Sequence, residues 1–195
     1  MAKKNQLTTA DIMPYEKFLE LVDKLHDDQE YRMELFARLQ FCTACRAGDV
    51  LRFRWEDILH QNKVVVTEHK TGKTRAITFN KSVLKTFDSL YKLMGEPDKS
   101  QLIFKSPTTD GAISIQFVNR ELKRIKRKYR MRIENFSTHT FRKSFGRYVY
   151  DKNNHSAEAL ILLNKIFNHS SLEITKTYIG ITQDEINGIF NSIQF

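Results

Sequence analysis

Apolar residues recur every three or four positions over most of the chain, which is the spacing of one face of an α-helix. The first such stretch begins near Leu7, where Thr8 and Asp11 have the spacing of a capping box, and Leu7 and Ile12 that of a hydrophobic staple. The pattern predicts a helix from there to Leu25. It predicts further helices at residues 31–39, 47–55, 81–94, 114–129, 138–150 and 157–167.

Two more helix starts with capping spacing lie near the C-terminus. Ser170 and Glu173 begin a helix that runs toward Tyr178, and Thr182 and Glu185 begin another over residues 182–195. The last helix has an apolar stripe that packs either on the chain's own core or on a neighbouring protomer: Ile186, Ile189 and Phe190.

The pattern changes to β-branched residues after residue 62. Residues 63–67 and 75–79 predict two strands, and residues 69–73 between them predict a turn, so we expect a β-hairpin with a basic tip. A short apolar strand is expected at residues 102–104. The predicted fold class is therefore mainly α with a small antiparallel β-sheet.

Length and composition agree with one domain over residues 1–195, with a core at about residues 7–181. Of the 195 residues, 41% are hydrophobic, which is enough for a substantial core, and no apolar run is long enough to span a membrane. Cys42 and Cys45 are the two cysteines. Without a second pair to complete a zinc site, we expect them to be small, reduced core residues. A reducing bacterial cytoplasm, with the protein associated with the nucleoid, is the expected location.

The basic residues are concentrated in one segment. Lys and Arg number 32 against 23 Asp and Glu, and residues 119–147 hold eleven basic but two acidic side chains. This balance favours an anionic partner, with nucleic acid first and a membrane surface second. Because consecutive helix positions spread around the axis, the basic residues of 123–130 cannot all face DNA. They either contact the phosphate backbone or form a solvated face over Val118, Leu122 and Ile125.

Several polar residues are candidates for chemistry, and each also has a structural interpretation. His139 and Arg142 are three apart and share a helix face. Arg46 follows an apolar helix and has a possible partner in Asp49, and Lys70 lies in the predicted turn. The two remaining candidates are a histidine after a helix end, His169, and a tyrosine among apolar neighbours, Tyr178.

Together these residues lie in four segments that resemble, in order, those of the tyrosine recombinases, also called phage integrases. Residues 41–58 resemble the first arginine box, and residues 69–75 the lysine hairpin of that family. Residues 139–145 (His-Thr-Phe-Arg-Lys-Ser-Phe) are similar to the His-x-x-Arg box, and residues 167–178 to the closing His and Tyr segment. The resemblance runs from about Leu7 to Ile181.

The resemblance implies that Arg46 and Arg142 clamp the scissile phosphate. The planar guanidinium donates two hydrogen bonds and holds a fixed charge, which stabilises the charge that grows on a pentavalent phosphorane. It further implies that Tyr178 attacks phosphorus to form a 3′-phosphotyrosyl bond and releases a 5′-hydroxyl.

Three more roles are implied for proton donors and acceptors. Lys70 would protonate the leaving oxygen, His139 would act in acid–base transfer around the tyrosine, and His169 would donate a hydrogen bond to the phosphate. The resemblance implies no ATP, because the covalent intermediate conserves the phosphodiester energy. It implies no metal ion and no other cofactor, because the cationic side chains neutralise the charge that a metal would otherwise neutralise.

The implied partners are double-stranded DNA and further copies of the chain, working as a tetramer on two DNA sites. Expected DNA contacts come from the hairpin and the basic segment: Lys73, Arg75, Lys123, Arg124, Lys126, Arg127 and Lys143. Two alternatives keep DNA as the partner: a type IB topoisomerase-like enzyme that relaxes DNA, and a DNA-binding module without catalysis.

Small departures from the family pattern leave every candidate group in place. Cys45 and Ala47 flank the first arginine, Asp49 stands where glutamate is more usual, and Asn168 replaces a common glycine. The N-terminal core-binding domain of most members has no counterpart here. The chain is therefore expected to be either a fragment or similar to the short fimbrial-type DNA invertases, and weaker DNA affinity follows from fewer neutralised phosphates.

Overall fold

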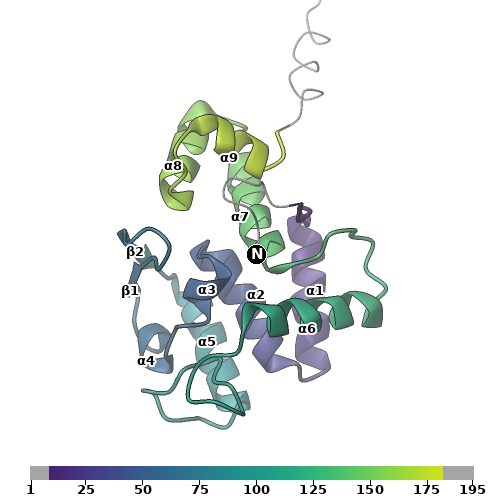
Figure 1. Ribbon diagram of the computed structural model, residues 1–195, viewed down its shortest axis with the longest axis vertical. Helices are drawn as coiled ribbons and strands as arrows, with labels where there is room; N and C mark the ends of the chain where they lie inside the picture. The colour runs from purple at the N-terminus through teal and green to yellow at the C-terminus, as the bar shows by residue number, and fades with distance from the viewer. Residues whose placement is uncertain (1–8, 182–195) are drawn as a thin grey trace, which may run out of the picture.

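The computed structural model describes residues 9–181, and in this range the fold is mostly helical with one two-stranded antiparallel sheet, as the sequence predicts (Figure 1). The elements are α1 (Tyr15–Asp27), α2 (Tyr31–Thr43), α3 (Ala47–Val50), α4 (Trp55–Ile58), β1 (Lys63–Thr67), β2 (Thr74–Thr78), α5 (Lys81–Leu93), α6 (Ile115–Lys128), α7 (Thr138–Lys152), α8 (Ala157–Phe167) and α9 (Leu172–Tyr178).

The prediction of a helix start at Leu7–Ile12 is wrong over the part of it that is described. Residues 9–14 are not helical, and α1 begins after Pro14, whose extended backbone serves as the N-cap. Asp11 is used elsewhere: its Oδ2 accepts hydrogen bonds from the backbone N–H groups of Glu134 (2.9 Å) and Asn135 (2.8 Å). The expected staple and cap residues Leu7 and Thr8, and the helix expected at 182–195, lie outside the described residues.

The single helix predicted at 47–55 is two short helices, α3 and α4. The chain turns extended at Arg54, where the Asp57 carboxylate accepts the Arg54 N–H at 2.7 Å in a capping box. A local cap thus ends one helix and begins the next despite continuous helical spacing. The strand expected at 102–104 is also absent, because Leu102 forms only an isolated bridge with Arg54. Similarly, the cap of α9 is Ser171 rather than Ser170.

Helix α2 is the centre of the main core. It packs against α1, α3, α5 and α7, and Leu35, Phe36, Ala37 and Leu39 are fully buried. A smaller apolar cluster lies under α8 and α9 and contains Leu163, Phe167, Tyr178 and Ile179 among others. Phe145 of α7 packs against both clusters, so α7 joins the α8–α9 end of the molecule to the rest (Figure 1).

The hairpin packs against the core through the inner face of β1. Lys63 pairs with Thr78 and Thr67 with Thr74, and Val64 and Val66 point into the core. Gly72 near the tip has φ of +67°, a left-handed conformation that favours glycine. This packing carries residues 68–73 to the C-terminal end of α8.

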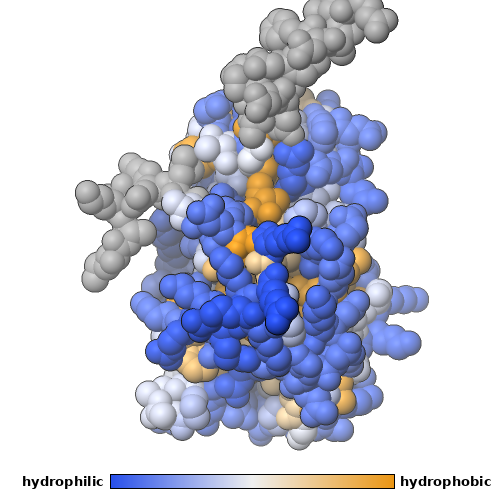
Figure 2. Space-filling view, turned by 90° about the vertical axis from the view of Figure 1, so that its right-hand side faces the viewer, coloured by the Kyte–Doolittle hydropathy of each residue, from blue (hydrophilic) through white to orange (hydrophobic). Residues whose placement is uncertain are grey.

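The face in Figure 2 is mostly hydrophilic, with one narrow strip of apolar residues near its centre and smaller apolar spots elsewhere. No helix between residues 9 and 181 is both long and apolar enough to cross a membrane.

The contact between α7 and α8 requires glycine at position 146. A Cβ there would lie 2.6 Å from Cζ of Phe167 and 2.7 Å from Cγ2 of Ile179, closer than real packing allows. Both neighbours are fully buried and have no room to move.

We therefore expect Gly146→Ala to destabilise the protein by about 1–3 kcal/mol, the range for overpacked cores, as measured by urea unfolding. Gly48→Ala is the matched control, because this second helical glycine has only Ile115 near the added Cβ, at 3.8 Å. Equal stability of the two variants would contradict the close α7–α8 contact.

Candidate active site

Two arginine side chains meet at the backbone carbonyl of Phe167, the last residue of α8. Arg142 projects from the second turn of α7, and its Nη2 donates to this oxygen at 2.9 Å. Arg46 follows the left-handed Ala44 that ends α2, and its Nη2 donates to the same oxygen at 3.5 Å. The carbonyl at a helix C-terminus carries a partial negative charge, so it attracts both guanidinium groups.

Arg142 is an unusual cation because it is 2% exposed. Burial, together with the nearby charges of Arg46 and Arg75, lowers the pKa of its guanidinium. Its Nη1 has no hydrogen-bond partner among the described residues. A buried polar atom without a partner is costly, so an anion that accepts from Arg142 would be strongly favoured there.

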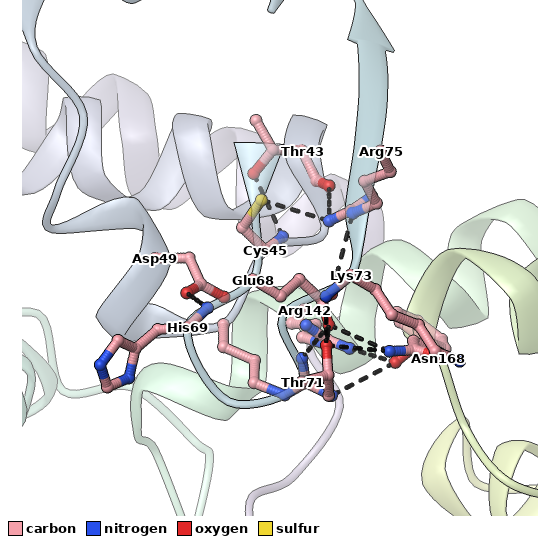
Figure 3. Close-up of polar contacts among 12 residues, drawn as sticks. Thr43, Cys45, Asp49, Glu68, His69, Thr71, Lys73, Arg75, Arg142 and Asn168 are labelled. Carbon is pink, nitrogen blue, oxygen red and sulfur yellow. Dashed lines mark hydrogen bonds and ion pairs between the residues drawn. The ribbon is translucent and has the colours of Figure 1, made fainter. Parts of the chain in front are cut away.

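Glu68 supplies the counter-charge in the protein itself (Figure 3). It is buried just beyond β1, and its Oε2 accepts from Arg46 Nη1 at 2.5 Å, from Thr71 Oγ1 at 2.8 Å and from Asn168 Nδ2 at 3.3 Å. Burial alone would raise the pKa of this carboxyl, but these hydrogen bonds outweigh burial and lower it. Glu68 therefore stays ionised beside the arginines.

Glu68 is a residue that the sequence did not single out. Asp49, the possible partner that the sequence offers for Arg46, instead accepts the backbone N–H of His69 at 3.0 Å. The signal available was weak: an acidic residue directly before a basic turn. Glu68 contacts Arg46, 22 positions earlier in the sequence, only because of the tertiary fold.

The turn that carries Lys70 is tied to the end of α8 by Asn168. Lys73 Nζ donates to Asn168 Oδ1 at 2.7 Å, and Asn168 Nδ2 donates to Thr71 Oγ1 at 3.1 Å (Figure 3). Asn168 has φ of +54°, a conformation that asparagine adopts more readily than most residues. Lys70 itself is exposed and has no hydrogen bond to the described residues. Its charge lies near enough to His139 to lower that residue's pKa.

Tyr178 ends α9 and is 7% exposed. Its ring packs against those of Phe167 and His169, each at 5.1 Å between centroids. Burial raises the pKa of the phenol, while the charges of Arg142 and Arg46 oppose that rise. The hydroxyl lies close to Arg142 but has no hydrogen bond of normal geometry within residues 9–181.

Both candidate histidines are neutral at pH 7. Burial and the charges of Arg142 and Arg46 lower the pKa of His169 to about 4. His139 lies at the start of α7; solvent reaches much of its ring, yet partial burial and the charge of Arg142 lower its pKa too. The structure thus brings Arg46, Arg142, His169 and Tyr178 together, with Lys70 and His139 beside them.

Three of the basic residues expected to contact DNA share one side of α6. Lys123, Lys126 and Arg127 line a depression of about 450 Å³ that also includes Ser137, the N-cap of α7 two residues before His139. Arg124 points elsewhere and forms ion pairs with Glu30 and Glu121, both at 2.8 Å.

The other expected contacts lie closer to the candidate catalytic groups. Arg75 Nη2 donates to the Thr43 carbonyl at 2.8 Å and lies 3.2 Å from Cys45 Sγ. Lys143 is buried, with Nζ donating to the Ala10 carbonyl at 2.7 Å and lying 5.5 Å from the centre of the Tyr178 ring.

Other features are not part of this cluster. Cys42 and Cys45 are free thiols, and burial raises the pKa of each. Within residues 9–181, no three His, Cys, Asp or Glu side chains are grouped to hold a metal ion. A cavity of about 580 Å³ lies between α1 and residues 129–134, and none of the candidate catalytic residues lines it.

If Glu68 balances the arginine pair, Glu68→Gln leaves buried positive charge without a counter-ion. We expect the free energy of unfolding to fall by roughly 2–3 kcal/mol. Breaking a fully buried ion pair costs about 3–5 kcal/mol, and the loss is smaller here because Arg46 is 24% exposed. Added sulfate should restore more stability to this variant than to the unmodified protein, because the anion replaces the carboxylate.

Thermal unfolding with and without sulfate measures both effects. Glu173→Gln, which removes the same charge from an exposed pair on α9, is the control and should respond little. An identical sulfate response in all three proteins would mean that the arginines do not form an anion site.

Comparison with known proteins identifies relatives of the chain. The model of the phage integrase family matches residues 12–185. A probable integrase/recombinase of Bacillus subtilis (strain 168), YoeC, is 30% identical over 169 residues, which are 84% of this chain and 88% of that protein.

Solved structures share the fold at low sequence identity. The post-cleavage complex of the XerH site-specific recombinase with a palindromic difH substrate has a TM-score of 0.72 at 19% identity. That match covers 97% of this chain and 54% of the XerH chain, so this chain spans about half of that structure's length. A lambda integrase tetramer bound to a Holliday junction has a TM-score of 0.63 at 18% identity and covers 91% of this chain and 49% of its own. The predicted fold is confirmed by these matches.

Proposed function

This chain belongs to the phage integrase family, and we propose that it is a site-specific DNA recombinase that cleaves and rejoins DNA through a 3′-phosphotyrosyl bond. One observation carries the proposal: Tyr178 and two converging arginines share a site in which two buried polar atoms, Tyr178 Oη and Arg142 Nη1, have no partner among the described residues. A scissile phosphate supplies what both atoms need, an acceptor for the guanidinium and an electrophile for the phenol.

In the cleavage step, Tyr178 Oη bonds to phosphorus while the bond from phosphorus to the 5′ oxygen breaks. Arg46 and Arg142 hold the non-bridging oxygens, whose charge grows in the transition state. The phenol proton passes to a base, for which neutral His139 is suited because its lowered pKa keeps the imidazole unprotonated at pH 7. Lys70 gives its proton to the departing 5′ oxygen.

Rejoining reverses these steps with a new 5′-hydroxyl as the nucleophile. The energy of the phosphodiester is kept in the phosphotyrosyl bond, so exchange between two DNA sites needs no energy source. We propose that copies of the chain carry out this exchange as a tetramer on two duplexes, in the bacterial cytoplasm at the nucleoid. The type of exchange (integration, excision or inversion) depends on the DNA sites.

Lys123, Lys126 and Arg127 form the proposed DNA backbone surface. Their i, i+3 and i+4 spacing puts them on one side of α6, and the depression that they line leads to the start of α7. Phosphate contacts there would position the duplex without reading its sequence. Lys126 Nζ also donates to the Glu134 carbonyl at 2.8 Å, but the side chain stays on this side of α6. Arg124 is left out because it is held in two ion pairs, and Arg75, Lys73 and Lys143 because they lie outside α6.

The decisive test is trapping of the covalent intermediate. The full chain is mixed in EDTA with supercoiled plasmid that carries the DNA flanking its own gene, and the reaction is quenched with detergent. Protein joined to DNA is then measured. We expect an adduct that Tyr178→Phe abolishes while DNA binding persists, because the ring is kept and only the nucleophilic oxygen is lost. Persistence of the adduct in Tyr178→Phe would remove this residue as the nucleophile.

DNA affinity should fall steeply with salt, since bound phosphates release counter-ions. Replacing Lys123, Lys126 and Arg127 together by glutamine should flatten the slope of log K against log salt by up to roughly 3, from about 0.9 per phosphate contact. The matched control replaces Lys81, Lys85 and Lys92 of α5, with the same change in net charge. Equal slopes for both triple variants would contradict the proposed surface.

A further inference from the structure

The orientation of the Asn164 amide is fixed by a backbone carbonyl. Its Nδ2 lies 2.7 Å from the Ser171 carbonyl oxygen, which can only accept, so the nitrogen and not the oxygen of the amide must face it. The same Nδ2 lies 3.0 Å from Thr175 Oγ1. The Thr175 hydroxyl therefore accepts a hydrogen bond from Asn164.

The hydroxyl proton of Thr175 then has one available acceptor among the described residues. Thr175 is completely buried, and its other hydrogen-bond partner within residues 9–181 is His169 Nδ1, at 3.0 Å. Because Asn164 donates to Oγ1, the threonine is free to donate its proton to the imidazole. His169 Nδ1 accepts with its lone pair and carries no hydrogen.

A neutral imidazole without a proton on Nδ1 carries it on Nε2. Nε2 has no hydrogen-bond partner among the described residues, while the His169 ring packs on Tyr178 and lies in the field of Arg142 and Arg46. A donor in this position can bind an anionic oxygen. The other tautomer would turn a lone pair toward that oxygen and repel it.

We propose that Thr175 and Asn164 are positioning residues that fix His169 as the Nε2–H tautomer, so that it donates to the scissile phosphate without being charged. The use of this donor rests on the proposed recombinase function, but the tautomer itself does not. Asn164 orients Thr175, Thr175 orients the proton of His169, and this chain of hydrogen bonds ends at the candidate active site.

The tautomer is measured directly by long-range ¹H–¹⁵N NMR of the DNA-free full chain at pH 7, with ¹⁵N-labelled histidine. His169→Asn identifies the signal of His169 by its loss. We expect Nε2–H in the unmodified protein and in Thr175→Ser, which keeps the hydroxyl. Thr175→Val, which keeps the shape and removes the hydroxyl, should give a mixture of the two tautomers or Nδ1–H. Nδ1–H in the unmodified protein overturns the proposal, and this result needs no variant to fold.

The rate of covalent adduct formation on the same plasmid tests the role of His169 at the phosphate separately from its tautomer. We expect Thr175→Val to slow adduct formation by about 10–100-fold, the loss of a hydrogen bond to a charged group, with Thr175→Ser near the normal rate. A changed tautomer with an unchanged rate would overturn the role of His169 at the phosphate and leave the tautomer assignment standing. An unchanged Nε2–H tautomer in Thr175→Val would overturn the positioning role itself. Loss of all adduct, in the unmodified protein as well, would count against the proposed function alone.

Discussion

The C-terminal end of α8 is the constraint on which the candidate site depends. Four residues between 164 and 169 face four different parts of the site. Asn164 donates to Thr175 of α9, the Phe167 carbonyl accepts from both arginines, Asn168 holds the turn that carries Lys70, and His169 packs against Tyr178. A helix end suits this task, because its last carbonyls have no partners in the helix and are free to accept side-chain donors.

Bringing two guanidinium groups to one carbonyl is unfavourable without negative charge nearby. The protein meets this cost in part with Glu68, which contacts Arg46 directly and has Arg75 3.8 Å from its other oxygen. Arg142 has less compensation for its charge. It contacts the Phe167 carbonyl and the face of the Phe167 ring at 5.0 Å, and its Nη1 has no hydrogen-bond partner among the described residues. Because Arg142 has the least compensation, a bound phosphate would gain most at this arginine, which lies close to Tyr178. The electrostatic strain of the DNA-free site thus favours binding where bond formation has to occur.

The sequence was sufficient where local pattern decides the outcome. Helical periodicity located α5 to α8 within a few residues, and alternation of β-branched residues located the hairpin, since both depend on neighbours in the chain. Prediction failed where distant groups compete for the same atoms. Asp11 has the spacing of a cap but is used by the backbone at 134–135, and Asp57 restarts the helix that spacing alone made continuous.

The residues of the candidate site also divide into those that the sequence could identify and those that it could not. Arg46, Lys70, His139, Arg142, His169 and Tyr178 were identified from motifs that resemble a known family, and the structure groups them. The residues that orient them could not be found in this way, because a glutamate before a turn or a threonine inside a short helix has an ordinary local explanation. The role of Glu68 depends on partners up to 100 positions away in the sequence. The role of Thr175 depends on a hydroxyl proton for which His169 is the remaining acceptor.

The position of Tyr178 adds a requirement on motion. Its hydroxyl is buried, and a duplex is too large to enter a packed core, so the proposed cleavage requires that α9 or its surroundings shift before a phosphate meets this hydroxyl. Gly180, at φ of +71°, lies just beyond the tyrosine that ends α9, and the hydrogen bonds of Thr175 with Asn164 and His169 tie the middle of α9 to the end of α8. In the proposed reaction, Tyr178 has to approach the phosphate while His169 keeps its orientation, and the hydrogen bonds of Thr175 supply that orientation where α9 contacts α8.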